Sequence, residues 1–150
     1  MTRLYALTFV LALAPLSTAA EDALDEVNAA RAARGLAPFT RDPGLTAAAQ
    51  AAADYRAQHR IAGHVSGGRG DFGFLPAGSW ADAAGCGALA PSWGWGACCT
   101  YDAYQTAGAA VTTGSDGRRY MHLFVRGGAG AGASSQASHY PSRSRRVFRR

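Results

Sequence analysis

Three cysteines are the residues of this 150-residue chain with the most direct chemical potential. Cys86 precedes the adjacent pair Cys98 and Cys99 by about a dozen residues, a loop length for which a disulfide stabilises a fold by roughly 3 kcal/mol. The leading expectation is one disulfide, from Cys86 to Cys98 or to Cys99, because a bond between adjacent cysteines is strained. The spacing does not determine which of the two pairs forms, and either disulfide would leave one cysteine outside the bond.

The amino terminus indicates the compartment in which these cysteines would be oxidised. Residues 1–20 contain Arg3, an apolar run up to Leu16 and then a set of small residues. This is the layout of a secretory signal peptide, and the apolar run is too short for a good membrane span. We therefore expect a protein that is secreted or held in the cell envelope, where disulfides form. A membrane anchor that is never cleaved is the alternative.

The segment that carries the cysteines also holds all three tryptophans of the chain. Trp93, Trp95, Tyr101 and Tyr104 are our candidate ligand-binding residues, because clustered rings can stack on the rings of a sugar. The alternative is that these aromatic side chains fill a core that the many alanines leave thin.

Two helices that could position these residues are expected in the first half of the chain. The first begins at a capping Asp22, carries Leu24 and Val27 on one side and ends at Gly35. The second begins at Asp42-Pro43, where the missing proline N–H costs nothing. Its apolar stripe comprises Leu45, Ala48, Ala49, Ala52 and Tyr55. Because alanine offers little apolar area, this helix depends on its neighbours for stability.

Two strands joined by a tight turn are expected near the end of the folded part. Residues 107–113 and 118–126 flank a Gly-Ser-Asp-Gly sequence, and Asp-Gly between two such runs is typical of a hairpin. Tyr120, His122 and Phe124 share one face of the second strand. Both faces of this strand are largely apolar, so we expect it to lie inside the sheet, covered on both sides.

The charge of the chain is concentrated at its end. The net charge of +5 comes from fifteen arginines, with no lysine, against ten acidic residues. Residues 143–150 hold five of the arginines, so residues 21–126, the expected single domain, are nearly neutral. A specific nucleic-acid surface is therefore not expected. The composition of residues 127–150 predicts a flexible tail whose basic end adheres weakly at most to anionic surfaces.

One longer pattern resembles a known family. It comprises Val27-Asn28-x-x-Arg31-x-x-x-Gly35-Leu36-x-Pro38-Phe39, then Asp42-Pro43-x-Leu45, and an alanine-rich helix that ends before Gly63-His64. It is similar to the amino-terminal half of the CAP superfamily, which contains the cysteine-rich secretory, antigen 5 and pathogenesis-related 1 proteins and short bacterial relatives. The resemblance implies an α+β fold, a helix–sheet–helix sandwich with a small antiparallel sheet.

The resemblance also implies a metal cleft in which two histidines and two acidic residues meet across the sheet. His64 matches the first histidine, but the second would fall near Cys98 and Cys99, and Asp82 is the only acidic residue near the place of the first acid. His64 is thus a metal candidate without partners, and the cleft is expected to be degenerate. A zinc site made by His64, Cys86, Cys98 and Cys99 is conceivable, but its spacing matches no common zinc motif.

Two functions of different classes remain open from the sequence. The first is an exported, non-catalytic CAP-like module that binds an unknown extracellular glycan, lipid or protein, with no catalytic residues and no cofactor. The second is a small extracellular enzyme that uses a residual metal centre or a thiol, Cys98 or Cys99, beside His64 or His122. The chain has no Gly-x-Ser-x-Gly motif and few acidic residues in its middle, which disfavours serine hydrolases and glycosidases.

Overall fold

The computed structural model describes residues 22–68, 70–89, 95 and 99–128. The elements are α1 (Ala23–Ala32), β1 (Thr40–Arg41), α2 (Pro43–His59), the 3-10 helix η1 (Asp71–Phe74), β2 (Ala83–Leu89), β3 (Tyr104–Thr113) and β4 (Arg119–Gly128). The predicted signal peptide, the tail beyond Gly128, Trp93 and Cys98 lie outside the described residues. Neither helix of the described part has the length and apolar character needed to cross a membrane.

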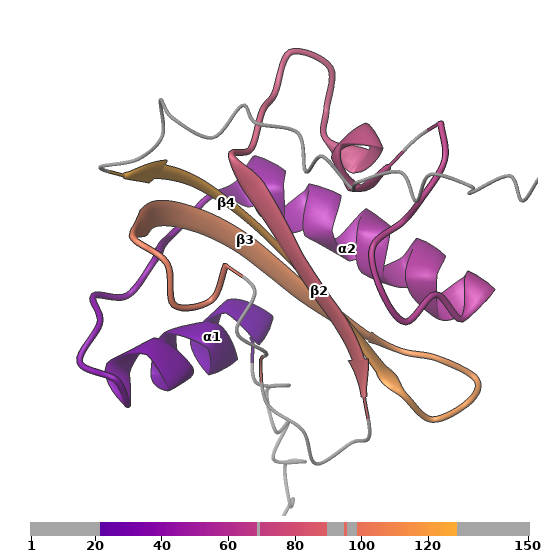
Figure 1. Ribbon diagram of the computed structural model, residues 1–150, viewed down its shortest axis with the longest axis horizontal. Coiled ribbons are helices and arrows are strands. Elements are labelled where there is room, and N and C mark those ends of the chain that lie inside the picture. Colours follow the sequence, from indigo (N-terminus) through magenta and orange to yellow (C-terminus); the bar gives the residue numbers. More distant parts are fainter. Residues whose placement is uncertain (1–21, 69, 90–94, 96–98, 129–150) are drawn as a thin grey trace, which may run out of the picture.

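One sheet, with strand order β1-β3-β4-β2, separates the two helices (Figure 1). Helix α1 packs its Leu24 and Val27 against one face, and α2 packs Leu45 and its alanines against the other. The predicted α+β sandwich is therefore confirmed. The sheet is mixed rather than antiparallel throughout, because β1 runs parallel to β3 while the other two pairings are antiparallel.

The helices begin after the predicted capping residues, whereas α1 ends at Ala32, before the predicted end at Gly35. The carboxylate of Asp22 accepts the N–H of Leu24, and that of Asp42 accepts the N–H of Leu45, both at 2.9 Å. The predicted apolar stripe of α2 was wrong at its end, since Tyr55 is half-buried and Arg56 is fully buried. Arg56 follows Ala52 at the spacing of one helical turn, so it is the long side chain that continues the buried stripe.

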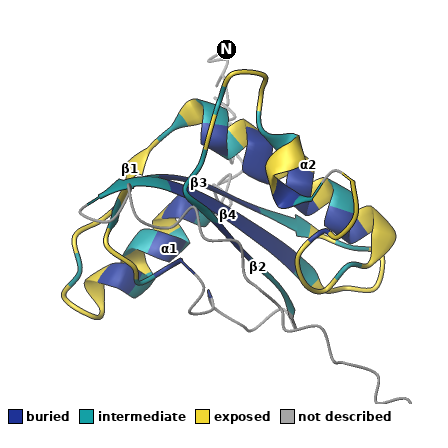
Figure 2. Cartoon of the chain, turned by 45° about the horizontal axis from the view of Figure 1, so that its top comes forward, coloured by how far each residue is buried: buried dark blue, intermediate teal, exposed yellow. Residues whose placement is uncertain are grey.

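The predicted hairpin is confirmed, with β3 and β4 paired from Tyr104–Gly128 to Thr113–Arg119. Strand β4 lies between β3 and β2, and its middle residues are buried on both faces (Figure 2). Phe124 belongs to the cluster against α2, whereas Met121, Leu123 and Val125 belong to the cluster against α1. The sequence did not predict β1 or β2, because the former has two residues and the latter is composed mainly of alanine and glycine.

Helix α2 lies directly on β3 at Gly108. A β-carbon at this position would lie 2.1 Å from the carbonyl carbon of Leu45 and 2.1 Å from the nitrogen of Thr46. Both atoms belong to the helix backbone and cannot move without the helix. Gly108 therefore sets how closely α2 approaches the sheet.

Replacing Gly108 by alanine should destabilise the fold by about 3 kcal/mol or more, because α2 must move away from the sheet. Gly63→Ala is the matched control, since nothing lies within 4 Å of its added β-carbon, and it should change stability by no more than about 0.5 kcal/mol. Urea unfolding followed by circular dichroism measures both values. Equal stability of the two variants would contradict the close contact.

Candidate functional site

His64, the histidine that the resemblance placed in a metal cleft, is paired with Asp71. Its Nδ1 lies against Oδ2 of Asp71, while Oδ1 of the same carboxylate accepts the backbone N–H of Val65 at 2.9 Å. The Asp71 side chain is 7% exposed and that of His64 is 55% exposed. The carboxylate at the start of η1 thus ties down the loop that follows α2 and orients His64.

His122 lies on β4 behind this pair, on the face of the sheet that α2 covers. Its ring is fully buried, and neither ring nitrogen has a hydrogen-bond partner among the described residues. Burial lowers the pKa of His122 to about 4, and the charges of Arg56 and His64 act in the same direction against the opposing effect of Asp71. His122 is therefore a neutral imidazole in the folded protein at neutral pH.

Arg56 holds these elements together from the buried end of α2. Its guanidinium donates to the carbonyls of Ala62 at 2.8 Å, Gly63 at 2.9 Å and Met121 at 2.6 Å. One side chain therefore connects α2, the loop before His64 and strand β4. The position of His64 beside the sheet depends on this contact.

The residues present do not fit the metal cleft that the resemblance implies. His64 and Asp71 are bound to each other, and both oxygens of Asp71 already accept a hydrogen bond or ion pair. Asp82, the acid considered from the sequence, instead accepts the N–H of Gly127 at 2.8 Å, at the far end of β4. Within the described ranges, no three histidine, cysteine or acidic side chains are placed to hold one ion.

The described cysteines lie on opposite faces of the sheet. Cys86 on β2 is the direct cross-strand neighbour of His122, on the side of α2, whereas Cys99 is buried in the cluster on the side of α1. The sheet between them prevents a Cys86–Cys99 disulfide and prevents both thiols from binding one zinc ion with His64. Pairing of Cys86 with Cys98 remains a prediction, because Cys98 lies outside the described part.

The candidate aromatic residues do not form one exposed platform where the structure describes them. Trp95 is 9% exposed in the core beside α1, and its indole N–H donates to Glu26 at 3.2 Å. Tyr104 packs against the same core, and the guanidinium of Arg34 covers the Tyr101 ring at 3.4 Å from its centroid. The alternative prediction, that these aromatic side chains fill the core, therefore holds for Trp95 and Tyr104. Trp93 lies outside the described residues.

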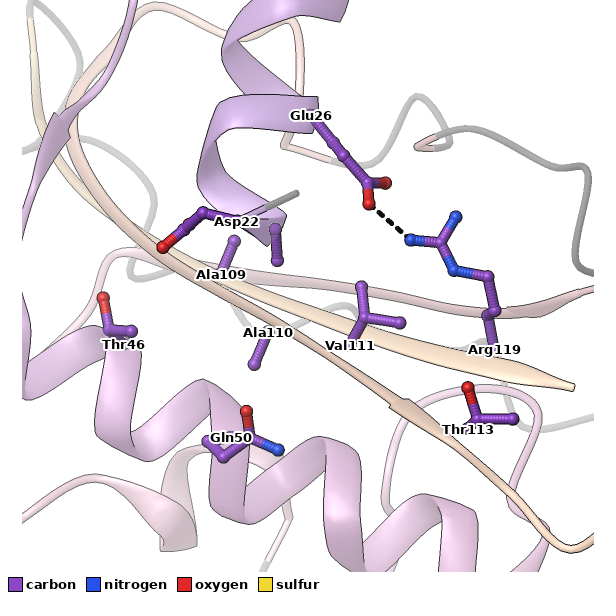
Figure 3. A pocket seen from close by; sticks show the side chains of 10 residues that line it. Asp22, Glu26, Thr46, Gln50, Ala109, Ala110, Val111, Thr113 and Arg119 are labelled. Carbon is purple, nitrogen blue, oxygen red and sulfur yellow. Dashed lines mark hydrogen bonds and ion pairs between the residues drawn. The ribbon is translucent and has the colours of Figure 1, made fainter. Parts of the chain in front are cut away.

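Two adjoining hollows follow the outer edge of β3, and we call them together the β3 groove. The first, of about 610 Å³, lies between Asp22 and Glu26 of α1 and Thr46 and Gln50 of α2 (Figure 3). The second, of about 390 Å³, continues along Asp54 of α2 to the β3–β4 turn. Thr113 lines both hollows, so they adjoin near the end of the strand.

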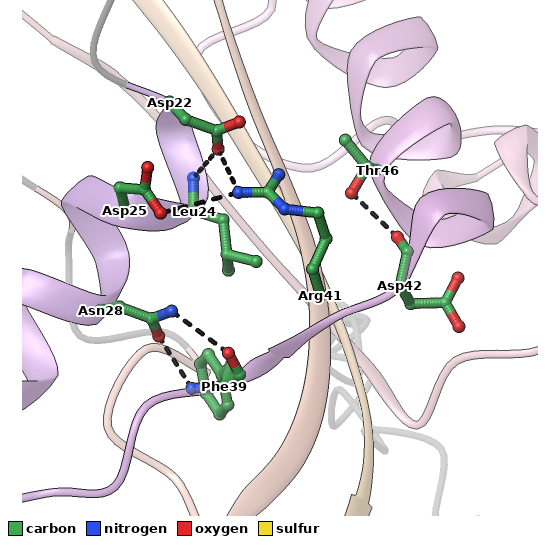
Figure 4. Close-up of polar contacts among 8 residues, drawn as sticks. All are labelled: Asp22, Leu24, Asp25, Asn28, Phe39, Arg41, Asp42 and Thr46. Carbon is green, nitrogen blue, oxygen red and sulfur yellow. Dashed lines mark hydrogen bonds and ion pairs between the residues drawn. The ribbon is translucent and has the colours of Figure 1, made fainter.

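The groove exists because β1 covers only the beginning of β3. Thr40 and Arg41 pair with Thr106 and Ala107, and the last contact of this edge is the N–H of Asp42 on the carbonyl of Ala107 at 2.9 Å. Pro43 then starts α2, and the chain leaves the sheet. Figure 4 shows the end of this segment, where Arg41 turns to Asp22 and Asp42 caps α2.

Backbone groups of β3 therefore face the groove. The carbonyl of Ala107 points to β1, whereas the N–H of Gly114 points to Arg118, which directly precedes β4. The backbone groups of successive residues in a strand point alternately to its two sides. The N–H and C=O groups of Ala109, Val111 and Thr113 consequently point away from β4. The described residues provide no hydrogen-bond partner for them on this side. Within the part of the chain that the structure describes, β3 beyond Ala107 is thus a free sheet edge.

The walls of the groove are polar. Glu26 pairs with Arg119 at 2.5 Å, and both side chains are largely buried, with 18% and 23% of their surface exposed. Gln50 and Thr112 both donate to Oδ1 of Asp54, at 2.8 and 2.5 Å. Asp54 has no basic partner among the described residues, in contrast to Asp22 and Glu26.

Comparison with known proteins identifies the family. The profile of the cysteine-rich secretory protein family, CAP, matches residues 24–112, which is more than half of the chain. The chain belongs to the CAP family. Neither a curated protein nor a solved structure gives a significant match. The functional assignment for this CAP domain therefore rests on its own site.

Sequence reasoning found His64 and placed His122 on the correct face of β4, but it missed Arg56, Asp71 and the β3 groove. The position of Arg56 in the apolar register of α2 was a signal, because a cation there must find carbonyl partners. Asp71 carried no comparable signal in a glycine-rich loop. The groove in this CAP domain results from the pairing of β1 with β3, which joins residues far apart in the sequence.

Because of His122, the free energy of unfolding should fall by about 2 kcal/mol when the pH is lowered from 7.5 to 5. The folded ring has a pKa of about 4 and an unfolded histidine titrates near 6.5, so the unfolded chain binds the extra proton in this window. His122→Leu should remove most of this loss, as measured by urea unfolding at both pH values. His59→Gln, at an exposed position, should keep the wild-type pH dependence. Identical pH dependence of the wild type and His122→Leu would contradict the buried neutral ring.

Proposed function

We propose that this CAP domain is an exported, non-catalytic module that binds an extended segment of a partner polypeptide in the β3 groove. The observation that carries the proposal is the row of backbone N–H and C=O groups at Ala109, Val111 and Thr113, which face the groove and have no hydrogen-bond partner among the described residues. A peptide that adds as a strand supplies the complementary groups at the same spacing.

A polypeptide suits this groove better than the lipid or glycan that the sequence also left open. Its walls are polar and carry Glu26, Gln50 and Asp54, which disfavours the acyl chain of a lipid. Its floor is a strand edge without the exposed aromatic rings on which sugars stack. The combined volume is in the range of binding sites for short ligands.

Two further observations support a binding role in an exported protein. The first twenty residues have the layout of a signal peptide, and the chain belongs to a family described as secretory. The only histidine that matches the implied metal cleft is held by Asp71, so the cleft is degenerate. Binding therefore takes place on the edge of the sheet, away from the histidines.

Val111→Pro should abolish strand addition while leaving the β3–β4 ladder intact. Proline removes the N–H that points into the groove, and edge strands tolerate proline where the N–H faces outward. A library of random twelve-residue peptides, displayed on phage and selected on the wild-type domain, provides the probe. Selected peptides should bind Val111→Pro at least about tenfold more weakly, which corresponds to roughly 1.4 kcal/mol.

Val111→Ala is the matched control, since it shortens the same side chain but keeps the N–H. It should bind the selected peptides within about twofold of the wild type. The amide signals of β4 in both variants verify that the sheet is formed. Failure to select any peptide, or equal binding by Val111→Pro and wild type, would exclude the groove as a peptide site.

A second candidate function, a thiol enzyme, has one specific observation in its favour. Cys86 is the cross-strand neighbour of His122, and Arg56 lies close enough for its charge to interact with the Cys86 thiol. The ring of His122 is fully buried, however, and neither of its nitrogens contacts a sulfur atom. A substrate would have to open the face between α2 and the sheet to reach the pair.

Alkylation of the native and the denatured protein without reductant, followed by mass measurement and zinc analysis, separates the two functions. The binding function predicts no zinc and slow reaction of Cys86 in the native protein, because its cross-strand neighbour His122 is fully buried. His122→Leu should leave that rate unchanged. A Cys86 that reacts faster than a free thiol and slows in His122→Leu would favour the enzyme.

A further inference from the structure

The β3 groove also has features that select the charge of its occupant. Asp54 stands on the α2 wall with its Oδ1 bound by Gln50 and Thr112, and no described arginine or histidine pairs with it. On the opposite wall, Asp22 pairs with Arg41 at 2.9 Å (Figure 4) and Glu26 pairs with Arg119 at 2.5 Å. The charged residues that line the groove are thus three acids and one arginine, Arg119, so the groove favours a basic strand.

The chain itself contains a segment of the required chemistry. Residues 143–150 read Arg-Ser-Arg-Arg-Val-Phe-Arg-Arg, which we call the arginine segment. In a strand, alternate side chains point to opposite walls. Arg145 and Arg149 would face one wall and Arg146 and Arg150 the other, so either register brings arginines to both walls.

The connection to this segment is long enough. Strand β4 ends at Gly128, which pairs with Tyr104 at the beginning of β3, and the groove lies five to nine residues further along that strand. This distance is about 17 to 30 Å at the rise of a strand. The fourteen residues from 129 to 142 can span up to about 46 Å when extended, and a flexible chain of that length averages about 20 Å. A tethered segment would reach the groove at a millimolar effective concentration.

We infer that the arginine segment adds to the free edge of β3 in the same molecule and occupies the β3 groove as a competitor of the partner polypeptide. The inference rests on the proposed peptide site and states how binding at that site would be regulated. The guanidinium groups pair with Asp54 and the acids of α1, while the backbone of the segment satisfies the outward groups of Val111 and Thr113. The partner must then displace a segment held by charge, and release becomes easier at high salt.

Amide hydrogen exchange in the chain of residues 21–150 tests this occupancy. The amides of Val111 and Thr113 should exchange at least tenfold faster after Arg145, Arg146, Arg149 and Arg150 are changed to serine. Asp54→Asn, which keeps the contact with Thr112 but loses the charge, should accelerate the same amides several-fold. The amides of Ala110 and Thr112, which face β4, should not change in either variant.

Phe148→Pro is the matched control for unspecific electrostatic adhesion, because it keeps every arginine but interrupts the strand. It should accelerate exchange at Val111 and Thr113 as the serine variant does. Protection should also fall as sodium chloride is raised from 0.05 to 0.5 M. Protection that Phe148→Pro leaves intact would show adhesion without strand addition and overturn the proposal.

Two further outcomes would overturn the proposal without affecting the peptide site. Equal exchange at Val111 and Thr113 in all variants would show that the arginine segment does not occupy the groove. Protection that rises with protein concentration would show that a second copy supplies the strand. In the first case the selected peptides would bind the serine variant and the wild type equally. In the second case the tighter binding by the serine variant would disappear on dilution, whereas occupancy in the same molecule predicts severalfold tighter binding by the serine variant at every protein concentration. A failed selection, by contrast, would remove the peptide site itself.

Discussion

Two buried guanidinium groups hold the loops of this domain to its sheet. Arg31 of α1 donates to the carbonyls of Ala37, Thr100 and Asp102, and Arg56 of α2 donates to three carbonyls on the other side. The helices are rich in alanine and offer little apolar area, so the loops cannot be fixed by hydrophobic contact alone. Arg31 thus connects three loop carbonyls on one side of the sheet, and Arg56 connects two loop carbonyls with the strand carbonyl of Met121 on the other.

The residues that define the family pattern act in the same way. Asn28 binds the backbone of Phe39 twice, accepting its N–H at 2.8 Å and donating to its carbonyl at 3.1 Å (Figure 4). The guanidinium of Arg31 also lies over the ring of Phe39, at 3.6 Å from the centroid. These contacts fix the segment that becomes β1 beside β3. These residues of the pattern therefore determine the fold.

The sequence predicted the elements whose signals are local and missed those that depend on distant pairing. The caps at Asp22 and Asp42 and the turn of the β3–β4 hairpin were found because each needs only a few neighbouring residues. Strand β2, composed mainly of alanine and glycine, has no pattern of its own and forms because β4 offers it an edge. Likewise, Trp95 gave the same signal for a sugar platform as for the core, and only its contact with Glu26 distinguishes the two. His64 was found through the resemblance, but its partner Asp71 was not, since both lie in a loop whose shape the sequence leaves open.

The two helices place different chemistry on the two sides of β3, and this separation supports the proposal that the groove, rather than the histidines, binds a ligand. On the buried side of α2, Arg56, His122 and Asp71 are closed off by the loop that follows the helix. On the other side, the same helix presents Thr46, Gln50 and Asp54 at intervals of one turn toward the edge of β3. An open edge is a liability in a protein, because any extended chain can pair with it. If the groove is the peptide site that we propose, its polar and charged walls would restrict that pairing to strands of suitable charge. The features that protect the edge would then also give it specificity.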